Sequence, residues 1–261
     1  MGPLLFNIFI NDILYERLNM YNYADDNTLA EISKSLPDLI TRLEKSTEKA
    51  MDWFTANSME ANPSKFQALI LGNAHNKENE IFNVNNTEIK PTSSVKLLGV
   101  EVDNDLRFDL HISTICKKAA IQLNSLRRLA PYLDMNTRKL LFNSFILSNF
   151  NYCPLVWHHC STKNTLKMEK IQERGLRIIL QDYKSTYNEL LQTTGRDFLY
   201  ISRLKKMMLF VYKSSLHGIF SEDPQGYNLC DGNKLSQPLV NTWAGPECRC
   251  GFCVLYQIRR R

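Results

Sequence analysis

The sequence predicts an α+β region over residues 1–108, an all-α region over residues 109–217 and an irregular tail over residues 218–261. In the first region, short apolar runs alternate with turn residues around one long stretch of helical spacing. In the second region, apolar residues recur at every third or fourth position in four successive stretches. The tail is rich in Gly, Pro and Asn and shows no period, which is typical of irregular chain.

Three elements are expected at the start of the chain. A helix follows Gly2-Pro3, where proline is well placed in the first turn. A β-hairpin is expected over residues 18–32, because Asp25-Asp26-Asn27 supplies turn chemistry. A long helix over residues 36–54 comes next, with Ser35 as its N-cap. The side chains of the first helix that we expect in the core are Leu4, Leu5, Phe6, Ile8 and Phe9.

The rest of the first region is predicted to be β-structure, and the second region to be helical. The expected strands are residues 66–71, a hairpin of 81–84 and 87–90 around Asn85-Asn86, and residues 95–102 with Gly99 at a bulge or close approach. The expected helices are residues 112–129, 140–146, 166–180 and 200–216.

The composition is that of an ordinary globular protein, with 44% hydrophobic and 23% charged residues among 261. No run approaches the roughly 20 apolar residues of a membrane helix, and we expect no membrane partner. The start shows no basic segment before an apolar core, so no secretory signal is expected. Seven cysteines, an odd number, favour reduced thiols and an intracellular protein.

The charge is divided unequally along the chain. Residues 1–110 contain 10 basic and 17 acidic residues, whereas residues 111–261 contain 22 basic and 10 acidic ones. A basic half favours a polyanionic partner, and an acidic half with adjacent carboxylates suits divalent cations. Two solvated surfaces of opposite sign would explain the same numbers.

Tyr23-Ala24-Asp25-Asp26 is the sharpest chemical signal. Adjacent carboxylates at a hairpin tip can bind Mg²⁺, and two such ions flank the transferred phosphate in polymerases. Alone, the tetrapeptide is a weak signal, because a solvated acidic turn has the same sequence.

The Tyr23–Asp26 tetrapeptide is one of several motifs that follow one another along the chain. In order, the motifs are residues 2–13, Tyr23–Asp26, Trp53-Phe54, Asn57, residues 62–65, residues 66–71, residues 95–100, His111-Ile112, residues 152–157 and residues 166–174. Together they resemble the reverse transcriptases of non-LTR (LINE-type) retrotransposons, in particular jockey- and CR1-like members, over roughly residues 2–240. Several ordered motifs are far more specific than one tetrapeptide.

The resemblance implies a partial palm of a right-hand polymerase, followed by a thumb-like helical region over residues 109–217. Asp25 and Asp26 would bind Mg²⁺ or Mn²⁺, and Tyr23 would lie beside the primer end. Lys65 would lie near the nucleotide phosphates and protonate pyrophosphate, although an ordinary surface lysine has the same sequence context. Leu98 and Gly99 would support the primer strand. The implied partners are an RNA template, a DNA primer and deoxynucleotides, and the implied location is the nucleus or the cytoplasm.

Basic residues on the predicted helices would contact the nucleic-acid backbone, although solvated helix faces explain any one pair equally well. The set is Lys117, Lys118, Arg127, Arg128, Arg138, Lys139, Lys170 and Arg174, with Lys167 and Arg177 nearby.

The sequence departs from the family pattern in two places. The family carries a further aspartate on a strand upstream of the Gly-Pro helix, and this chain begins at that helix. We therefore expect neighbouring strands without a partner and no polymerisation by this chain alone. Residues 243–253 replace the expected continuation, as a frameshift would.

Two cysteine clusters are predicted not to bind zinc, because neither contains two spaced ligand pairs. They are Cys230, Cys248, Cys250 and Cys253 in the tail, and Cys153, His158, His159 and Cys160. Two alternatives to a reverse transcriptase fragment remain open: a non-catalytic nucleic-acid-binding helical protein, and the product of a decayed element.

Overall fold

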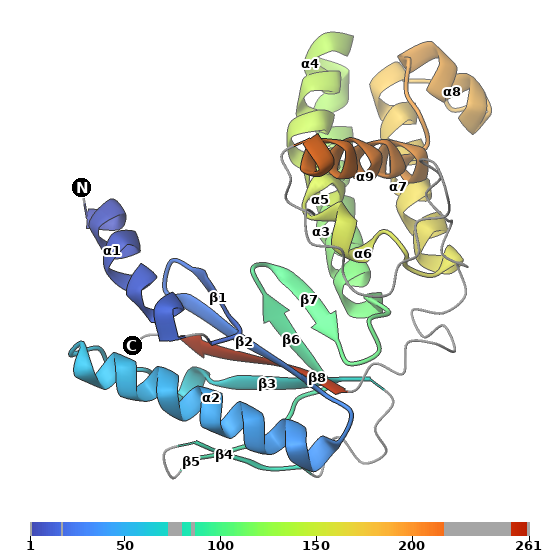
Figure 1. Ribbon diagram of the computed structural model, residues 1–261. Coiled ribbons are helices and arrows are strands. Elements are labelled where there is room, and N and C mark those ends of the chain that lie inside the picture. Colours follow the sequence, from blue (N-terminus) through green and yellow to red (C-terminus); the bar gives the residue numbers. More distant parts are fainter. Residues whose placement is uncertain (1, 17, 73–79, 85–86, 217–251, 260–261) are drawn as a thin grey trace. The chain divides into compact units, whose positions relative to one another are not determined.

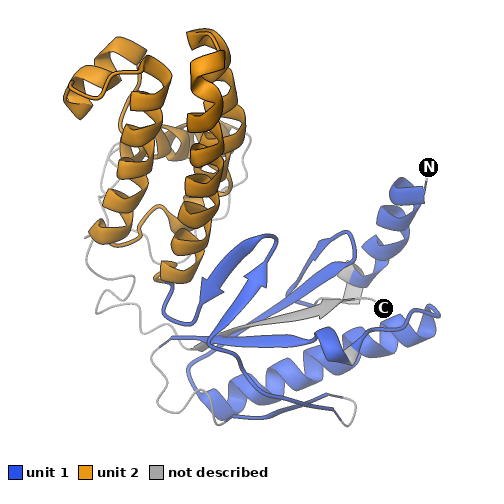
Figure 2. Ribbon diagram, turned by 180° about the vertical axis from the view of Figure 1, so that it is seen from behind, with its two compact units in different colours: residues 1–106, 241–261 blue, residues 107–240 orange. Residues whose placement is uncertain are grey.

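The computed structural model describes residues 2–16, 18–72, 80–84, 87–216 and 252–259. The chain forms two compact units (Figure 2). The first unit comprises residues 1–106 and 241–261, and the second comprises residues 107–240.

The first unit combines one long helix with short strands (Figure 1). Its elements are α1 (Gly2–Ile10), η1 (Asn11–Glu16), β1 (Met20–Tyr23), β2 (Asp26–Ser33), α2 (Leu36–Ala56), η2 (Pro63–Lys65), β3 (Gln67–Leu71), β4 (Phe82–Val84), β5 (Thr87–Ile89), β6 (Ser94–Leu97), β7 (Val100–Asp103) and β8 (Phe252–Arg259).

A four-stranded sheet in the order β1-β2-β8-β3 forms the centre of this unit. β8 runs antiparallel to both of its neighbours, along all of β2 and all of β3. This strand lies in the segment that the sequence pattern indicated as irregular. Eight residues are too few to reveal a strand when nothing nearby in the sequence pairs with them. We expected strands of this region to lack a partner, and in the structure β8 pairs with β2 on one side and with β3 on the other.

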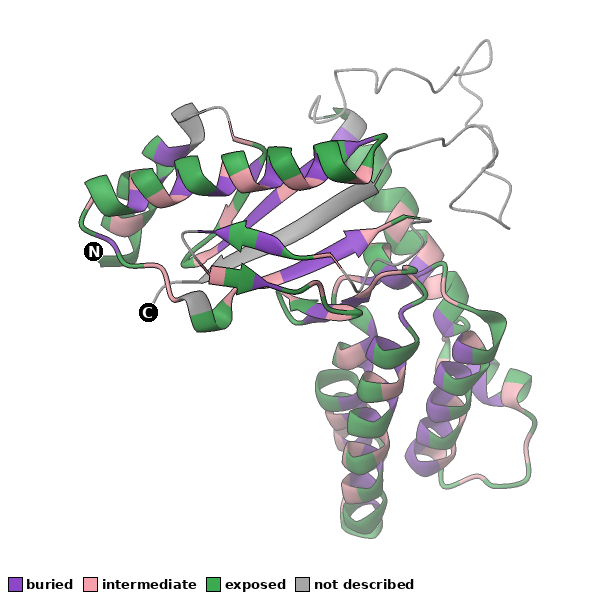
Figure 3. Cartoon of the chain, turned by 90° about the horizontal axis from the view of Figure 1, so that it is seen from below, coloured by how far each residue is buried: buried purple, intermediate pink, exposed green. Residues whose placement is uncertain are grey.

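α2 covers one face of this sheet, and its buried side chains recur at helical spacing (Figure 3). Leu39, Leu43 and Phe54 belong to the same buried cluster as Leu29 of β2 and Ile70 of β3. The pattern of these apolar positions along the sequence therefore predicted the helix and its buried face.

Ser35 stands at the N-cap of α2, as expected, but its side chain makes no capping bond. Ser33 takes part instead: its hydroxyl accepts a bond from the Ser35 N–H and donates one of 2.5 Å to the Asp38 carboxylate. The hydrogen bond from the Ser33 hydroxyl is the main cause of a lowered pKa at Asp38, and a hydrogen bond from Arg42 is the second cause.

Residues 95–102 were expected to form one strand, and this prediction was wrong. They form the β6–β7 hairpin, with Leu97 paired to Val100 across a two-residue turn. Leu98 and Gly99 both have positive φ, 45° and 85°. Hairpin turns of this kind usually carry Asn or Gly at the first position, so the leucine hid the turn. The separate pair β4–β5 matches the other expected hairpin, whose turn at Asn85-Asn86 lies outside the described residues.

The expected burial of the first helix was also wrong. Leu4, Leu5 and Ile8 are about two-thirds exposed, at 65%, 60% and 62%, and Phe9 is 42% exposed. Ile10 is buried, and Phe6 packs against the core. Because α1 is apolar on all sides, its sequence does not indicate which face meets the protein.

The second unit is helical. Its elements are α3 (Asp109–Leu129), η4 (Ala130–Tyr132), α4 (Met135–Leu141), η5 (Phe142–Leu147), α5 (Ser148–Asn151), α6 (Pro154–Trp157), α7 (Thr162–Leu180), α8 (Tyr187–Thr194) and α9 (Leu199–Leu216). α4, η5 and α5 form one continuous rod with a π-helical centre, where the sequence indicated a single shorter helix. α6 and α8 were not predicted, because four and eight residues give little periodicity.

Glu169 of α7 joins three helices of this unit. Its carboxylate accepts bonds from the Tyr187 hydroxyl at 2.6 Å and from the backbone N–H groups of Leu199 and Tyr200, at 3.2 and 2.9 Å. The last two belong to the first turn of α9, where N–H groups have no partner within the helix. A negative charge is favourable at that end of a helix, so Glu169 fixes the start of α9 against α7 and α8.

Candidate functional site

The β1–β2 hairpin carries the two predicted metal ligands. Tyr23 pairs with Asp26, which leaves Ala24 and Asp25 as the two turn residues. The hairpin confirms the expectation, although its turn begins before the Asp25-Asp26-Asn27 segment. Ala24 has φ 52°, a conformation in which glycine is the usual residue. The strained alanine holds Asp25 at the tip and Asp26 at the first position of β2.

The surroundings of the two carboxylates differ. Asp25 is exposed and Asp26 is half-buried. Behind the turn, Asn27 is 3% exposed and its amide Nδ2 donates to the Asp25 carbonyl at 3.3 Å. Its Oδ1 has no hydrogen-bond partner among the described residues. The outer side chain of β1 nearest the turn, Tyr23, is 67% exposed.

A small pocket opens beside the turn, and it adds a carboxylate that the sequence did not indicate. Asp25 and Asn27 line it from the hairpin, and Glu60 lines it from the segment after α2. Its other walls are apolar: Phe6, Ile10, Phe54, Met59 and Ala61. Glu60 is 34 residues from Asp26 in sequence, so only the fold brings it to the turn.

The donors at this turn are of the type that Mg²⁺ and Mn²⁺ prefer, because carboxylate oxygens are hard ligands. They are few, however. Within the described parts of the chain, no three His, Cys, Asp or Glu side chains gather closely enough to hold a metal ion. Asp25 and Asp26 bring two carboxylates to this turn.

The other residues expected near nucleotide or primer lie elsewhere in the first unit. Lys65 is exposed at the end of η2, after an Asn62 turn in which Oδ1 accepts from the N–H and hydroxyl of Ser64 at 3.1 and 2.7 Å. Leu98 and Gly99 occupy the β6–β7 turn, where Leu98 is 39% exposed.

The basic residues that were expected to contact nucleic acid differ in how far they are buried. Lys117, Lys118, Arg127, Arg128, Lys170 and Arg174 are exposed, and Lys139 is half-buried. Arg138 differs: it is 8% exposed, and its guanidinium donates to the carbonyls of Ile178 at 3.1 Å and Asp134 at 3.4 Å. The guanidinium of Arg138 is thus bound inside the unit, unlike the side chains of the six exposed residues.

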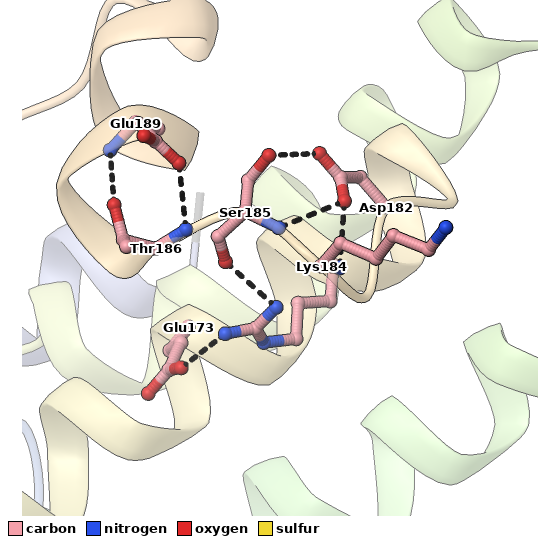
Figure 4. Close-up of polar contacts among 7 residues, drawn as sticks. Glu173, Asp182, Lys184, Ser185, Thr186 and Glu189 are labelled. Carbon is pink, nitrogen blue, oxygen red and sulfur yellow. Dashed lines mark hydrogen bonds and ion pairs between the residues drawn. The ribbon is translucent and has the colours of Figure 1, made fainter.

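Arg177 also has an internal role. It pairs with Glu173 at 2.8 Å and donates to the Ser185 carbonyl at 3.0 Å. In the same loop, Asp182 accepts from the Ser185 hydroxyl and from the Ser185 and Lys184 N–H groups (Figure 4). These bonds, the hydroxyl first, lower the pKa of Asp182 to about 2. A capping box of Thr186 and Glu189 then begins α8.

α7 carries a basic stripe, of which the sequence pattern predicted only a part. Lys163, Lys167, Lys170 and Arg174 stand at positions i, i+4, i+7 and i+11, and all four are exposed. This spacing places them on one face of the helix. With 1.5 Å per residue, the stripe is about 16 Å long, which matches about five base pairs of a duplex. We call these four residues the α7 stripe.

The Cys153, His158, His159 and Cys160 cluster lies around α6. His158 is 2% exposed and stacks on the Tyr200 ring, with centroids 4.9 Å apart. Cys160 Sγ lies 3.7 Å from the Thr165 hydroxyl, and burial raises the pKa of its thiol. The contacts of His158 and Cys160 are those of side chains packed inside the helical unit. Cys230, Cys248 and Cys250 lie outside the described residues.

Comparison with models of known protein families, with curated proteins and with solved structures finds no match for this chain. No helix among the described residues has both the length and the apolar character needed to cross a lipid bilayer.

Proposed function

We propose that this chain is a part of an RNA-directed DNA polymerase of the non-LTR retrotransposon type, comprising palm-like and thumb-like regions. Its first unit would receive the primer end at the Asp25-Asp26 turn. Its second unit would bind the backbone of the template–primer duplex. Mg²⁺ or Mn²⁺, when bound, would activate the primer hydroxyl and stabilise the departing pyrophosphate.

One observation carries the proposal: Asp25 lies in the two-residue turn of a hairpin and Asp26 begins the strand that leaves it, with the expected long helix and strand after it. A tip position is what a metal site needs if its substrate lies outside the sheet. The ordered motifs along the sequence give the same order of elements. The exposed Tyr23 leaves an aromatic face available beside that tip.

A cross-linking experiment tests where the primer end binds. The full chain is mixed with an RNA–DNA hybrid that carries a photoreactive nucleotide, either at the primer 3′ end or ten nucleotides inside. We expect the terminal probe to react with residues 18–34, and the internal probe with α3 or α7. Tyr23→Leu should reduce the terminal cross-link, whereas Tyr132→Leu, at another exposed tyrosine, should not. A terminal probe that reacts only with the second unit contradicts the proposal.

Polymerisation by this chain alone is not part of the proposal. Two carboxylates on one side of a metal pair should align it poorly. We expect no primer extension on an RNA template with Mg²⁺ or Mn²⁺. Template-directed extension by the purified chain, lost in Asp25→Asn, would show that the site is complete.

The α7 stripe favours a second candidate, a helical nucleic-acid-binding protein without catalysis. Both candidates predict that Lys163→Gln, Lys167→Gln and Lys170→Gln together weaken hybrid binding and reduce its salt slope by about three. The matched control removes three exposed lysines of the first unit, Lys34, Lys45 and Lys49, and should leave the slope unchanged. Only the terminal cross-link separates the two candidates. Salt-insensitive binding contradicts both.

A further inference from the structure

The helix α9 buries one face in the second unit and exposes an apolar stripe on the opposite face. Its buried side chains, Leu199, Arg203 and Ser214, lie on one face because their spacings of 4 and 15 residues are close to whole helical turns. The residues of the opposite face are all exposed, and we call them the α9 stripe: Ile201, Lys205, Met208, Leu209, Tyr212 and Leu216. The outer face of a surface helix is usually polar, so this stripe indicates a surface that a partner covers.

The α9 stripe is large enough for a weak protein–protein contact. Its five apolar side chains are between 37% and 66% exposed. Side chains of this size present roughly 100 Å² each at such exposed fractions, so one copy offers on the order of 500 Å². Two such stripes facing each other would bury about 1,000 Å², near the lower limit for a specific interface. The area therefore suits a dimer that forms in the micromolar range rather than a permanent one.

The positions of the α9 stripe are symmetric about its midpoint. Residues 201 and 216, 205 and 212, and 208 and 209 each lie at equal distances from the point between Met208 and Leu209. A two-fold axis through that point places Ile201 opposite the partner's Leu216 and each central residue opposite the other. An interface between two identical copies requires this self-complementarity, because each half of the surface meets the partner's other half.

The charges of α9 favour an antiparallel pair over a parallel one. The charged side chains of the helix are all basic: Arg203, Lys205, Lys206 and Lys213. A parallel pair in register would place every lysine beside the same lysine of the partner, which is unfavourable. The antiparallel pair places the partner's Tyr212, Val211 and Leu204 opposite Lys205, Lys206 and Lys213, respectively. Lys205, the only charged residue of the stripe, already forms an ion pair with Asp197.

We propose that the α9 stripe is the contact surface for a second copy of this chain, and that the two α9 helices pack antiparallel about a two-fold axis between Met208 and Leu209. The stem of Lys205 then lies against the ring of the partner's Tyr212, where a cation is favourable. The contact uses none of the residues assigned to metal or nucleic acid, so it is independent of the proposed function.

Sedimentation equilibrium of the full chain tests the dimer. We expect a monomer–dimer equilibrium with a dissociation constant in the micromolar range. Met208→Glu should raise this constant about a hundredfold or more, because the two-fold axis would bury two carboxylates without partners. The matched control is Ile121→Glu on α3, at a side chain that is 69% exposed and outside the stripe. It should leave the dissociation constant unchanged.

Two substitutions at residue 212 test the orientation of the helices. Tyr212→Glu places a carboxylate opposite the partner's Lys205, whereas Tyr212→Lys places a second cation there. Both variants lose the ring, but the dimer of Tyr212→Lys should dissociate about tenfold more readily, and high salt should reduce the difference. In a parallel pair residue 212 would face its own copy, so both variants would weaken the dimer equally.

Three results would overturn the inference. They are a chain that stays monomeric at millimolar concentration, a dimer that Met208→Glu leaves intact, and equal dissociation of the two Tyr212 variants. Circular dichroism shows whether each variant keeps its helices. If Met208→Glu does not fold, the comparison of the two Tyr212 variants decides alone.

Discussion

Arg203 and Arg138 are both buried arginines of the second unit, but their guanidinium groups meet different surroundings. Arg203 is 1% exposed, and its group lies over the Trp157 ring at 5.3 Å. Its Nη1 lies 3.6 Å from the Met168 sulfur. Nε and Nη2 have no hydrogen-bond partner in the part of the chain that the structure describes. Arg138, in contrast, donates to two backbone carbonyls.

This difference predicts opposite effects of the same substitution. Arg203→Met removes a buried charge that forms no ion pair among the described residues and retains most of its volume, so the free energy of unfolding should stay equal or rise. Arg138→Met leaves the buried Ile178 carbonyl without its donor and should lower that free energy by about 1–3 kcal/mol. Urea unfolding of both variants measures this. Equal destabilisation by the two substitutions would contradict the argument.

His158 makes the second unit sensitive to acid. Burial, the nearby Arg203 and the neighbouring His159 lower the pKa of His158 to about 4. The unfolded histidine has its ordinary pKa of about 6.5. Below pH 6.5 His158 therefore binds a proton in the unfolded state but not in the folded state. The free energy of unfolding falls as the pH is lowered from 6.5 to about 4.

The expected loss from this group is about 1 kcal/mol between pH 6.5 and 5.5. His158→Phe keeps an aromatic ring against Tyr200 and cannot titrate, so this part of the pH dependence should disappear. His159→Gln, at the adjacent exposed histidine, should retain it. Urea unfolding at the two pH values gives the comparison. A pH dependence that persists in full in His158→Phe assigns it to other groups.

At the scale of elements, α7 approaches η5 closely because residue 175 has no side chain. A Cβ built on Gly175 would lie 2.0 Å from the nearest carbon of the Phe142 ring, which is fully buried. Glycine in mid-helix is unfavourable by itself, so its presence here reflects this packing. The Phe142 ring of η5 thus occupies the position that a side chain at residue 175 of α7 would take.

Gly175→Ala should therefore destabilise the protein by about 2–4 kcal/mol, although alanine is the better helix former. Phe142→Leu alone creates a cavity and should also destabilise. The double variant should recover much of the loss, because the smaller side chain makes room for the new methyl group. Urea unfolding of the four proteins gives the coupling. Additive effects would mean that the two residues do not share the space.

The sequence predicted those elements whose signals lie within the element. The long helix α2 followed from its apolar spacing, and the β1–β2 hairpin from its aspartates and asparagine. The β6–β7 turn was missed because its first residue is Leu98, which gives no turn signal. The exposure of Leu4 and Ile8 was missed because α1 is apolar on all sides.

The residues of the candidate site divide in the same way, into those with a local sequence signal and those brought together only by the fold. Asp25 and Asp26 are adjacent in sequence and were found there. Glu60 reaches the same pocket only through the fold, and the pairing of Arg259 with Asp26 joins residues 233 positions apart. On the helices, helical spacing alone would have added Lys163 to the α7 stripe. The burial of Arg138 depends on a carbonyl of a different helix and has no sequence signal.

At the scale of the whole molecule, the last described strand of the chain belongs to the unit formed by its first residues. β8 supplies ladder partners to β2 and to β3, and so occupies the centre of the sheet rather than its edge. The helices of the second unit have their own buried core, which includes Phe142, Trp157 and Leu176. The stability of the first unit should therefore depend on β8, and that of the second should not.

Leu255→Pro tests this dependence, because proline removes a backbone N–H from a central strand and disrupts its ladder. Amide hydrogen exchange should accelerate on the order of a hundredfold in β2, β3 and α2, and remain unchanged in α3, α7 and α8. Leu255→Val, which suits a strand, is the control and should leave both units protected. Faster exchange throughout the chain would mean that the two units unfold as one, and unchanged exchange in β2 and β3 would mean that their pairing with β8 contributes little.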